Sequence, residues 1–434
     1  MRNVHALRIA LAVWPALALA EAAKPLSEEE AVAEALAKSS QIAAARARAD
    51  AATDVARSLR GRMLPGVQVS DEQDRYRQPW VATFNIGVQP PPRLQARDLN
   101  TNTFAAGLEQ PLLGLARLSQ DHAALSSAAN AAEVDVRAAE ADVREQVKTR
   151  LLRLFEARAL AGTAVASQEQ LAEEQRIMQV KLRTGVATTA DVLRVEVALA
   201  NARQEEIQAR VQEDDARASL LAMLGRDQSD ATVDFAEPQV MEEAAERAPE
   251  LGAAIDQAVT RRPELASAQL TAQSARERAS ARSLSLLPEV DLEAGYVHIQ
   301  GESLAPEDST YVGLKASWNV FEWGASFYDR RAAAERADAA EAEQEDVRRR
   351  VGAEVSIRLA QVQAAASAVS VARTAIASAE EAYRVTQVAL QAGSATTTDL
   401  LDSQSALTQA RLNLVRARYE LAIARVQLER AVGG

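Results

Sequence analysis

The strongest constraint on this chain is an internal repeat. Residues 182–193 (LRTGVATTADVL) match residues 390–401 (LQAGSATTTDLL) at an offset of 208. Upstream, the same offset carries residues 110–113 (QPLL) onto residues 318–321 (WNVF) without a gap. A fixed long-range offset is typical of one structural unit that occurs twice, so the fold must satisfy the same local signals in both copies.

The offset changes to 223 nearer the N-terminus, where the pair Leu64 and Pro65 aligns with Leu287 and Pro288. The first copy therefore holds 15 extra residues between Pro65 and Gln110. Extra length that leaves both flanking alignments intact is expected in a surface loop.

The periodicity changes in the same order within each copy. Residues 27–62 and 247–285 are rich in alanine and polar residues, and a proline follows each of them, which predicts helices. Further along each copy come about 65 residues without proline, 116–182 and 324–390, which predict very long helices.

Between these helices the sequence alternates with a period of two, which predicts strands. In the second copy Val290, Leu292, Ala294 and Tyr296 alternate with polar residues and glycine, and a second run follows at Val312, Leu314, Ala316 and Trp318. The two runs predict a hairpin. In the first copy the alternation is weaker, at Val67, Val69, Phe104, Ala106 and Leu108. The pattern fits a membrane-facing hairpin or a half-buried soluble one.

The last helix carries a coiled-coil pattern. Leucine recurs every seven residues from Leu400 to Leu428, with serine or alanine three places after each leucine. This spacing predicts a helix–helix seam with small residues on one side. In the first copy Glu206 and Glu213 occupy two of the leucine positions, which predicts a different partner surface there.

The N-terminus reads as a secretory signal peptide. Arg2 and Arg8 precede an apolar run over residues 9–20, and small residues occupy Ala20 and Ala22, where we expect cleavage. The alternative, a membrane anchor, needs about 20 apolar residues to cross a bilayer, more than this run holds. Cleavage after residue 22 moves the formal net charge from -12 to -13, because it removes two arginines and one glutamate.

The composition excludes several classes of function. The acidic net charge argues against nucleic acid as a partner. The chain has no cysteine, which excludes disulfides, thiolate metal sites and a lipid on an N-terminal cysteine. His5, His122 and His298 are isolated, and no phosphate-binding loop, nucleophile elbow or HExxH motif occurs, so we expect no enzyme, no metal site and no cofactor.

The repeated order of helix, hairpin, very long helix, glycine-containing turn and helix resembles the TolC-like outer-membrane factor (outer membrane efflux protein) family over essentially the whole mature chain. The most specific segments are residues 183–192 and 391–400, which in that family form turns at the periplasmic tip. The resemblance implies a mainly α fold with a small β part, in which a long α-helical barrel continues a transmembrane β-barrel of twelve strands shared by three copies. Four strands in one chain cannot close a barrel alone.

The resemblance also implies a domain order. After a signal peptide at 1–22 come repeat 1 at 23–226, with a hairpin at 65–112 and a tip turn at 183–191, an equatorial linker at 227–246, and repeat 2 at 247–434, with a hairpin at 288–320 and a tip turn at 391–399. The strand residues expected to face lipid include Val290, Leu292, Tyr296, Val312, Leu314 and Trp318. Tyr296 and Trp318 suit the membrane interface.

Acidic residues near the tip are the sharpest site candidates. By resemblance, Asp399 and Asp402 match carboxylates around a narrow periplasmic entrance, and Asp191 matches an inner-tip position; in a trimer each becomes a ring that favours cations. A structural role competes, because Thr188 with Asp191, and Thr396 with Asp399, each have the spacing of a capping box.

The resemblance implies that the tip contacts a periplasmic adaptor through Leu182, Gly185, Val186, Leu390, Gly393 and Ser394. The alternative is a turn without a partner. Leu390 and Ala395 stand where the best-known channel of the family links its closed helices through tyrosine and arginine, so closure here depends on other contacts.

The leading hypothesis is a passive outer-membrane exit duct of a tripartite efflux or type I secretion system, a homotrimer in outer-membrane lipid that works with an adaptor and an inner-membrane transporter. One alternative is a non-conducting periplasmic coiled-coil tether, and another is a soluble binding module or enzyme. Matched membrane-compatible hairpins favour the duct.

Overall fold

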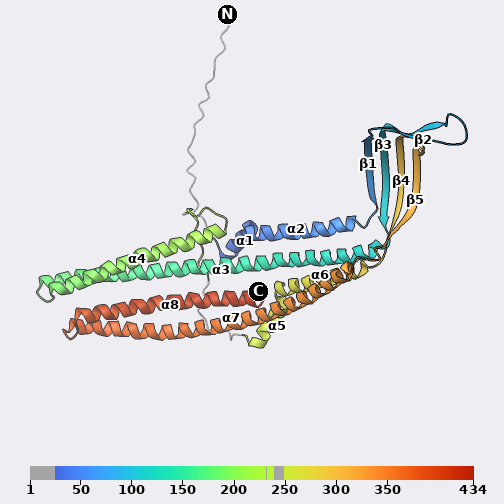
Figure 1. Cartoon of the computed structure of the whole chain (residues 1–434). Coiled ribbons are helices and arrows are strands. Elements are labelled where there is room, and N and C mark those ends of the chain that lie inside the picture. The colour runs from blue at the N-terminus through green and yellow to red at the C-terminus, as the bar shows by residue number, and fades with distance from the viewer. Residues whose placement is uncertain (1–24, 231, 239–248) are drawn as a thin grey trace, which may run out of the picture. The chain divides into compact units, whose positions relative to one another are not determined.

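The computed structural model of the protein describes residues 25–230, 232–238 and 249–434. The predicted signal peptide and much of the predicted linker at 227–246 lie outside these residues. The described chain is mainly helical with a small strand part, as the sequence predicts (Figure 1). It divides into two compact units. Of the described residues, the first unit comprises 25–37, 147–230, 232–238 and 378–419, and the second comprises 38–146, 249–377 and 420–434.

Two helices are far longer than the rest. α3 covers Gly114–Arg183 with 70 residues, and α7 covers Ala325–Gln391 with 67. Each is followed by a 35-residue helix, α4 at Thr189–Met223 and α8 at Thr397–Ala431. At 1.5 Å per residue α3 reaches about 105 Å. Alanine and unbranched polar residues favour this, because they lose little rotamer freedom in a helix.

The two shorter helical segments are each broken once, where the sequence predicts single helices. α1 ends at Lys38 (Glu28–Lys38) and α2 begins at Ser40 (Ser40–Gly61), because the Ser39 hydroxyl accepts a hydrogen bond from the Ile42 N–H at 3.4 Å and caps α2. α5 (Leu251–Arg261) stops before Pro263, which opens α6 (Pro263–Leu284). Proline suits the first helical position but not a helix interior.

The second unit contains one antiparallel sheet. Its strands are β1 (Gly66–Arg75), β2 (Trp80–Thr83), β3 (Arg93–Pro111), β4 (Glu289–Glu302) and β5 (Asp308–Ser317). The order is β1-β3-β4-β5, and β2 pairs with the N-terminal end of β3. The extra residues of the first copy therefore form β2 and a longer β3 in addition to loop, so our expectation of a plain loop, with two strands in that copy, was wrong.

The two hairpins have the same register. Glu289 lies opposite Ser317 in the second copy and Gly66 opposite Glu109 in the first, and these pairs are related by the offsets 223 and 208. All ten pairs of the second hairpin map onto the ten of the first in this way. The structure thus repeats at the level of individual strand pairs.

Each face of the sheet has a distinct chemistry. Leu292 lies opposite Leu314, and Ala294 lies opposite both Val312 and Leu108, so apolar residues from three strands share one face. The opposite face carries Asp291, Glu293 and Lys315, and the Lys315 Nζ lies 3.1 Å from a Glu293 carboxylate oxygen. Because side chains alternate between faces, this register separates the apolar from the charged set.

Each unit has its own core. In the first, Leu171 of α3 packs with Leu199 and Ala202 of α4, and Leu401 of α8 covers them. In the second, Val351 and Val355 of α7 pack against Ala431 of α8 and against α5. The predicted leucine seam of α8 contributes to these cores, since Leu400, Leu407 and Leu428 are buried.

A chain of ion pairs links four helices of the second unit. The guanidinium of Arg430 in α8 donates to Asp142 of α3, at 2.7 and 2.9 Å, and to Glu264 of α6. Arg262 donates to the same Glu264, at 3.1 and 3.2 Å, and also to Glu354 of α7. The side chains of Arg262 and Arg430 are only 7% and 9% exposed. Such charges need their partners, because a buried unpaired charge is costly.

Candidate functional site

The candidate site lies at the turns that follow the two long helices, in the first unit. Gly185 and Gly393 both adopt φ of 76°, in the left-handed region where a side chain is strained. The N–H of Val186 donates to the Lys181 carbonyl at 2.8 Å, and the N–H of Ser394 donates to the Ala389 carbonyl at 2.9 Å. These are equivalent six-residue closures of the helix end. Glycine is required because the turn passes through positive φ.

The second tip carries a capping box around Asp399. Thr396 donates to Asp399 Oδ2 from its N–H at 2.8 Å and from its hydroxyl at 2.7 Å, and the Asp399 N–H donates back to that hydroxyl at 3.2 Å. The bonds from the Thr396 backbone and side chain lower the pKa of Asp399. This carboxylate therefore stays ionised near neutral pH, and the capping bonds occupy only its Oδ2 oxygen.

The first tip repeats the capping box but neutralises its acid more fully. The Asp191 carboxylate accepts from Thr188, at 2.6 Å from the hydroxyl and 3.0 Å from the N–H. Arg194 lies 3.6 Å away, and the Asp191 side chain is only 20% exposed. Thr188, followed by Thr397 of the second tip, lowers the Asp191 pKa. A half-buried carboxylate beside an arginine contributes less field to a pore than an exposed one.

Asp402 differs from both capping residues. It lies one turn beyond Asp399 on α8, and it is exposed. Among the described residues it makes no hydrogen bond or ion pair, so no local structural contact accounts for an acid here. Asp399 and Asp402 are three residues apart and share one side of the helix.

The turns also present the predicted contact residues. Val186 is 76% exposed, which leaves it available to another molecule. Gly185, Gly393 and Ser394 are exposed too, whereas Leu182 and Leu390 are half-buried. Among the predicted contact residues, those within the turns are therefore more exposed than the two leucines at the helix ends.

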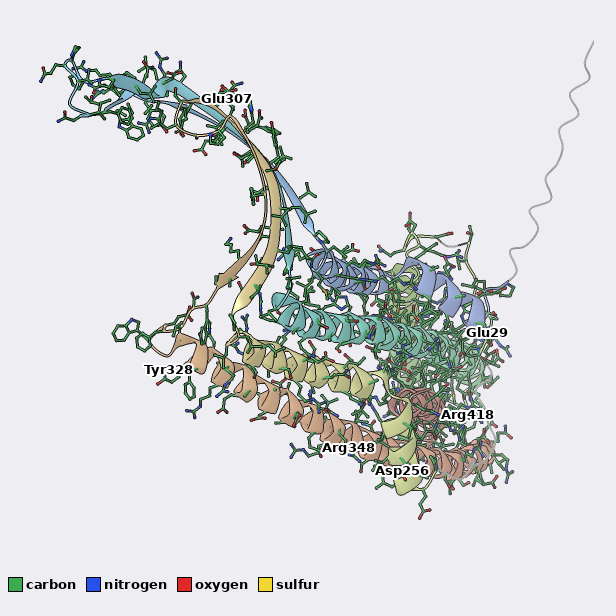
Figure 2. The ribbon with its side chains drawn as sticks, turned by 90° about the vertical axis from the view of Figure 1, so that its right-hand side faces the viewer. Glu29, Asp256, Glu307, Tyr328, Arg348 and Arg418 are labelled. Atoms are coloured by element: carbon green, nitrogen blue, oxygen red, sulfur yellow. The ribbon has the colours of Figure 1, made fainter. Side chains whose placement is uncertain are left out.

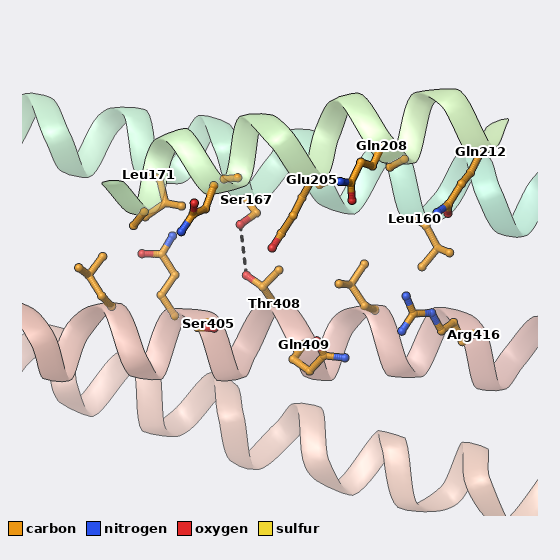
Figure 3. A pocket seen from close by; sticks show the side chains of 18 residues that line it. Leu160, Ser167, Leu171, Glu205, Gln208, Gln212, Ser405, Thr408, Gln409 and Arg416 are labelled. Atoms are coloured by element: carbon orange, nitrogen blue, oxygen red, sulfur yellow. Dashed lines mark hydrogen bonds between the residues drawn. The ribbon is translucent and has the colours of Figure 1, made fainter. Parts of the chain in front are cut away.

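A cavity in the same unit was not foreseen from the sequence. It has a volume of about 420 Å³ and lies where α3, α4 and α8 meet (Figure 3). Ser167 of α3 and Thr408 of α8 form a hydrogen bond of 3.3 Å across it, and Glu205 of α4 points toward the same place (Figure 3). Gln404 lines the cavity and is 3% exposed, and neither amide atom has a hydrogen-bond partner in the described structure. No local sequence pattern predicts which polar residues of different helices will line the same cavity.

The strand residues expected to face lipid are largely uncovered in the single chain. Val312 is 79% exposed and Leu314 is 69% exposed, and the Trp318 indole, 61% exposed, donates to the Leu286 carbonyl at 3.3 Å. Val290 and Leu292 are half-buried, and Tyr296 is 37% exposed. A contiguous apolar surface of this kind is typical of a face that contacts lipid or another subunit.

An aromatic cluster continues this surface where β5 gives way to α7. Phe321 and Trp323 pack edge to face at 5.0 Å, as do Phe327 and Tyr328 at 5.4 Å. Trp323 is 88% exposed, and Tyr328 points away from the ribbon at the start of α7 (Figure 2). The first copy has only aliphatic residues such as Leu112 and Leu113 at this junction, so the cluster belongs to one repeat.

Within the described residues, no group of three or more histidine, cysteine, aspartate or glutamate side chains could hold a metal ion. His298 instead lies 2.9 Å from Asp308 at the far end of the sheet.

The sequence profile of the family described as outer membrane efflux protein matches residues 31–226 and 254–434. Among curated proteins, the chain is similar to the outer membrane efflux protein BepC of Brucella suis biovar 1 (strain 1330). The two are 22% identical over 376 residues, which cover 85% of this chain and 80% of BepC.

Two solved structures show the same fold at low sequence identity. The outer membrane protein VceC of Vibrio cholerae superposes with a TM-score of 0.79 at 17% identity, over 94% of this chain and 96% of VceC. The outer membrane channel CmeC of Campylobacter jejuni superposes with a TM-score of 0.78 at 15% identity, over 94% of this chain and 85% of CmeC.

Proposed function

The chain belongs to the outer membrane efflux protein family, and from this premise we propose that three copies assemble into one passive duct from the periplasm to the cell exterior. The family is one of outer-membrane transport proteins rather than enzymes, and we propose that this protein likewise has no catalytic activity. The periplasmic tether that the sequence left open is set aside, because membership of an efflux family does not favour it.

The observation that carries the proposal is the two-faced sheet with two open edges. β1 and β5 are exposed along nearly their whole length, and each leaves one side of its backbone unpaired. An open edge is not tolerated in lipid, so the sheet must close with other copies. Every neighbouring pair in the path is antiparallel, so with four strands the two edges run in opposite directions and can pair with each other between copies.

The number of copies follows from the size of the lumen. Two copies would give eight strands, and a barrel of that size is filled by its own side chains. Three copies give twelve strands, and three is the smallest number of copies whose closed barrel leaves an aqueous channel. The charged face with Asp291, Glu293 and Lys315 then lines the channel, and the apolar face with Val312 and Leu314 meets lipid.

The helices carry apolar surface that supports the same assembly. On α4, Leu193 and Val197 are 55% and 61% exposed, and on α7, Ile357 and Val371 are 57% and 69% exposed. Different surfaces on different helices suit a head-to-tail contact that closes into a ring. By length and composition α7 could cross a membrane, the one such helix in the described chain. We assign the exposed apolar residues of α7 to contact between copies, because a helix of 67 residues is far longer than the thickness of a bilayer, about 30 Å.

At the tip, the exposed carboxylate of Asp402 and the ionised Asp399 form rings of three around the channel axis. Such rings favour cations and narrow the entrance. Asp191, close to Arg194, makes the smaller contribution. Since Leu390 and Ala395 offer no polar link between helices, packing and these carboxylates govern closure.

The duct works with partners in the envelope. The exposed turn at Gly185, Val186, Gly393 and Ser394, with the half-buried Leu182 and Leu390 behind it, is the surface for a periplasmic adaptor. The adaptor joins the duct to an inner-membrane transporter, which supplies the energy of a tripartite efflux or type I secretion system. Val186, which is 76% exposed, gives this surface an apolar side chain for the adaptor to cover.

Single-channel conductance of the detergent-purified protein in a planar bilayer tests the duct and its acidic entrance. The native protein should give small cation-selective openings, and Asp402→Asn should lower the cation preference. Asp191→Asn is the matched control and should change selectivity less. Well-folded trimers without any conductance would contradict the duct, and an unchanged Asp402→Asn channel would remove the carboxylate from the entrance.

A further inference from the structure

The repeat determines how two copies should join. The structure shows one junction between repeats within the chain, where β3 of the first copy pairs with β4 of the second. The hairpins on either side of that junction have identical registers, ten pairs in each. When three chains close a ring, the junction from β5 to β1 of the next chain is the only other kind, and it joins the corresponding strands. Resting on the proposed trimer, we infer that β5 and the next protomer's β1 pair in the register observed between β3 and β4.

The register follows from the two offsets. Strand β3 maps onto β5 by adding 208, and β4 maps onto β1 by subtracting 223. The observed pair Glu109 with Glu293 therefore becomes Ser317 with Ser70 of the next protomer. In the same way the observed pair of Gly107 and Gly295 becomes Lys315 with Glu72.

The charges agree with this register. Lys315 is the only basic residue of β5, and its side chain is 60% exposed in the single chain although it already lies near Glu293. The inferred junction between β5 and β1 places Lys315 directly opposite the carboxylate of Glu72 of the next protomer, on the polar face of the sheet. Opposite charges facing each other across strands stabilise a sheet. The seam thus carries an ion pair at a position where the observed junction has two glycines without side chains.

The apolar face agrees as well. The observed pair Gln110 with Leu292 becomes Trp318 with Val69 of the next protomer. Both side chains are more than half exposed in the single chain, at 61% and 62%. The seam brings the indole against an apolar partner on the lipid side. A shift by one residue would exchange the faces of β1 and put its valines in the lumen, which the alternation opposes.

Disulfide formation between chains tests the register directly, because the native sequence has no cysteine. The double variant Ser70→Cys with Ser317→Cys places small thiols at two opposite positions. Opposite residues in an antiparallel pair have Cα atoms about 4.5–5.5 Å apart, within disulfide range, whereas positions shifted by two residues lie about 7–8 Å apart. The controls are Ser317→Cys with Gln68→Cys, and Ser317→Cys with Glu72→Cys.

In oxidised outer membranes, the Ser70→Cys, Ser317→Cys chain should lose most of its monomer band to covalent dimers and trimers on a non-reducing gel. Dithiothreitol should restore the monomer. Stronger crosslinking of either shifted control would overturn the register and leave the trimer intact. Light scattering of the native protein in detergent separates the two ideas, because a monomer there would refute the trimer itself.

A second pair guards against a variant that fails to fold. Asn319→Cys with Gln68→Cys is also opposite in the inferred register, since it corresponds to the observed pair Pro111 with Asp291. It should crosslink as the serine pair does. Failure of both pairs in protein that is trimeric by light scattering would refute the register.

Discussion

Glu264 holds two nearly buried arginines, and replacing it with glutamine should destabilise the second unit. Its carboxylate accepts from Arg262 at 3.1 and 3.2 Å and from Arg430, and the glutamate side chain is 29% exposed. Glutamine keeps the shape but not the charge. Each arginine then keeps one acidic partner, Glu354 or Asp142, and loses the other.

The expected magnitude follows from the carboxyl pKa. Burial of Glu264 by itself raises its pKa, but the hydrogen bonds from Arg262 and Arg430 outweigh burial and lower it from 4.5 to about 2. A shift of one pKa unit corresponds to about 1.4 kcal/mol, so ionised Glu264 contributes about 3 kcal/mol to folding at pH 7. This is within the range measured when one member of a buried ion pair is removed.

The sign of the pH dependence follows from the lowered pKa. The contribution of Glu264 is fully present above the unfolded value of 4.5, and it is lost as the pH falls from 4.5 toward about 2. The native protein should therefore exceed Glu264→Gln in stability by about 3 kcal/mol at pH 7 but by only about 1 kcal/mol at pH 3.

Thermal unfolding in detergent, followed by circular dichroism at both pH values, measures this difference. Glu381→Gln is the matched control, because Glu381 forms a bidentate pair with Arg384 in which both side chains are more than 60% exposed. We expect little change in the control, since exposed pairs contribute little. Equal unfolding temperatures for the native protein and Glu264→Gln at pH 7, or a difference that grows toward pH 3, would refute the reasoning.

Three further changes test other parts of the structure. Gly393→Ala should destabilise the tip by about 1–2 kcal/mol, because alanine is strained at positive φ; an unchanged unfolding temperature would mean that the turn relaxes. Gln404→Leu should raise stability by about 1 kcal/mol by removing a buried amide without partners, and a lower unfolding temperature would show that the amide is satisfied. Trp318→Phe should reduce the quenching of tryptophan fluorescence by brominated lipids in proteoliposomes, whereas unchanged quenching would place this indole away from lipid.

The sequence alone determined what depends on neighbours along the chain. The helix ends at Gly185 and Gly393, the caps at Thr188 and Thr396 and the alternation of β4 and β5 all follow from residues within a few positions of one another. Comparison of the two copies reinforced these signals, because each local pattern occurs twice. The mainly helical fold and the family could therefore be predicted from the sequence.

Only the tertiary structure decided which distant residues meet. Asp142, Glu264 and Arg430 are brought together from three helices, and nothing near any of them in the sequence distinguishes it from an ordinary solvated charge. The cavity around Gln404 and the pairing of β3 with β4 are likewise long-range. The physical reason is that charge pairing and strand register depend on the distances between elements, whereas helix caps, glycine turns and face alternation are properties of the local backbone.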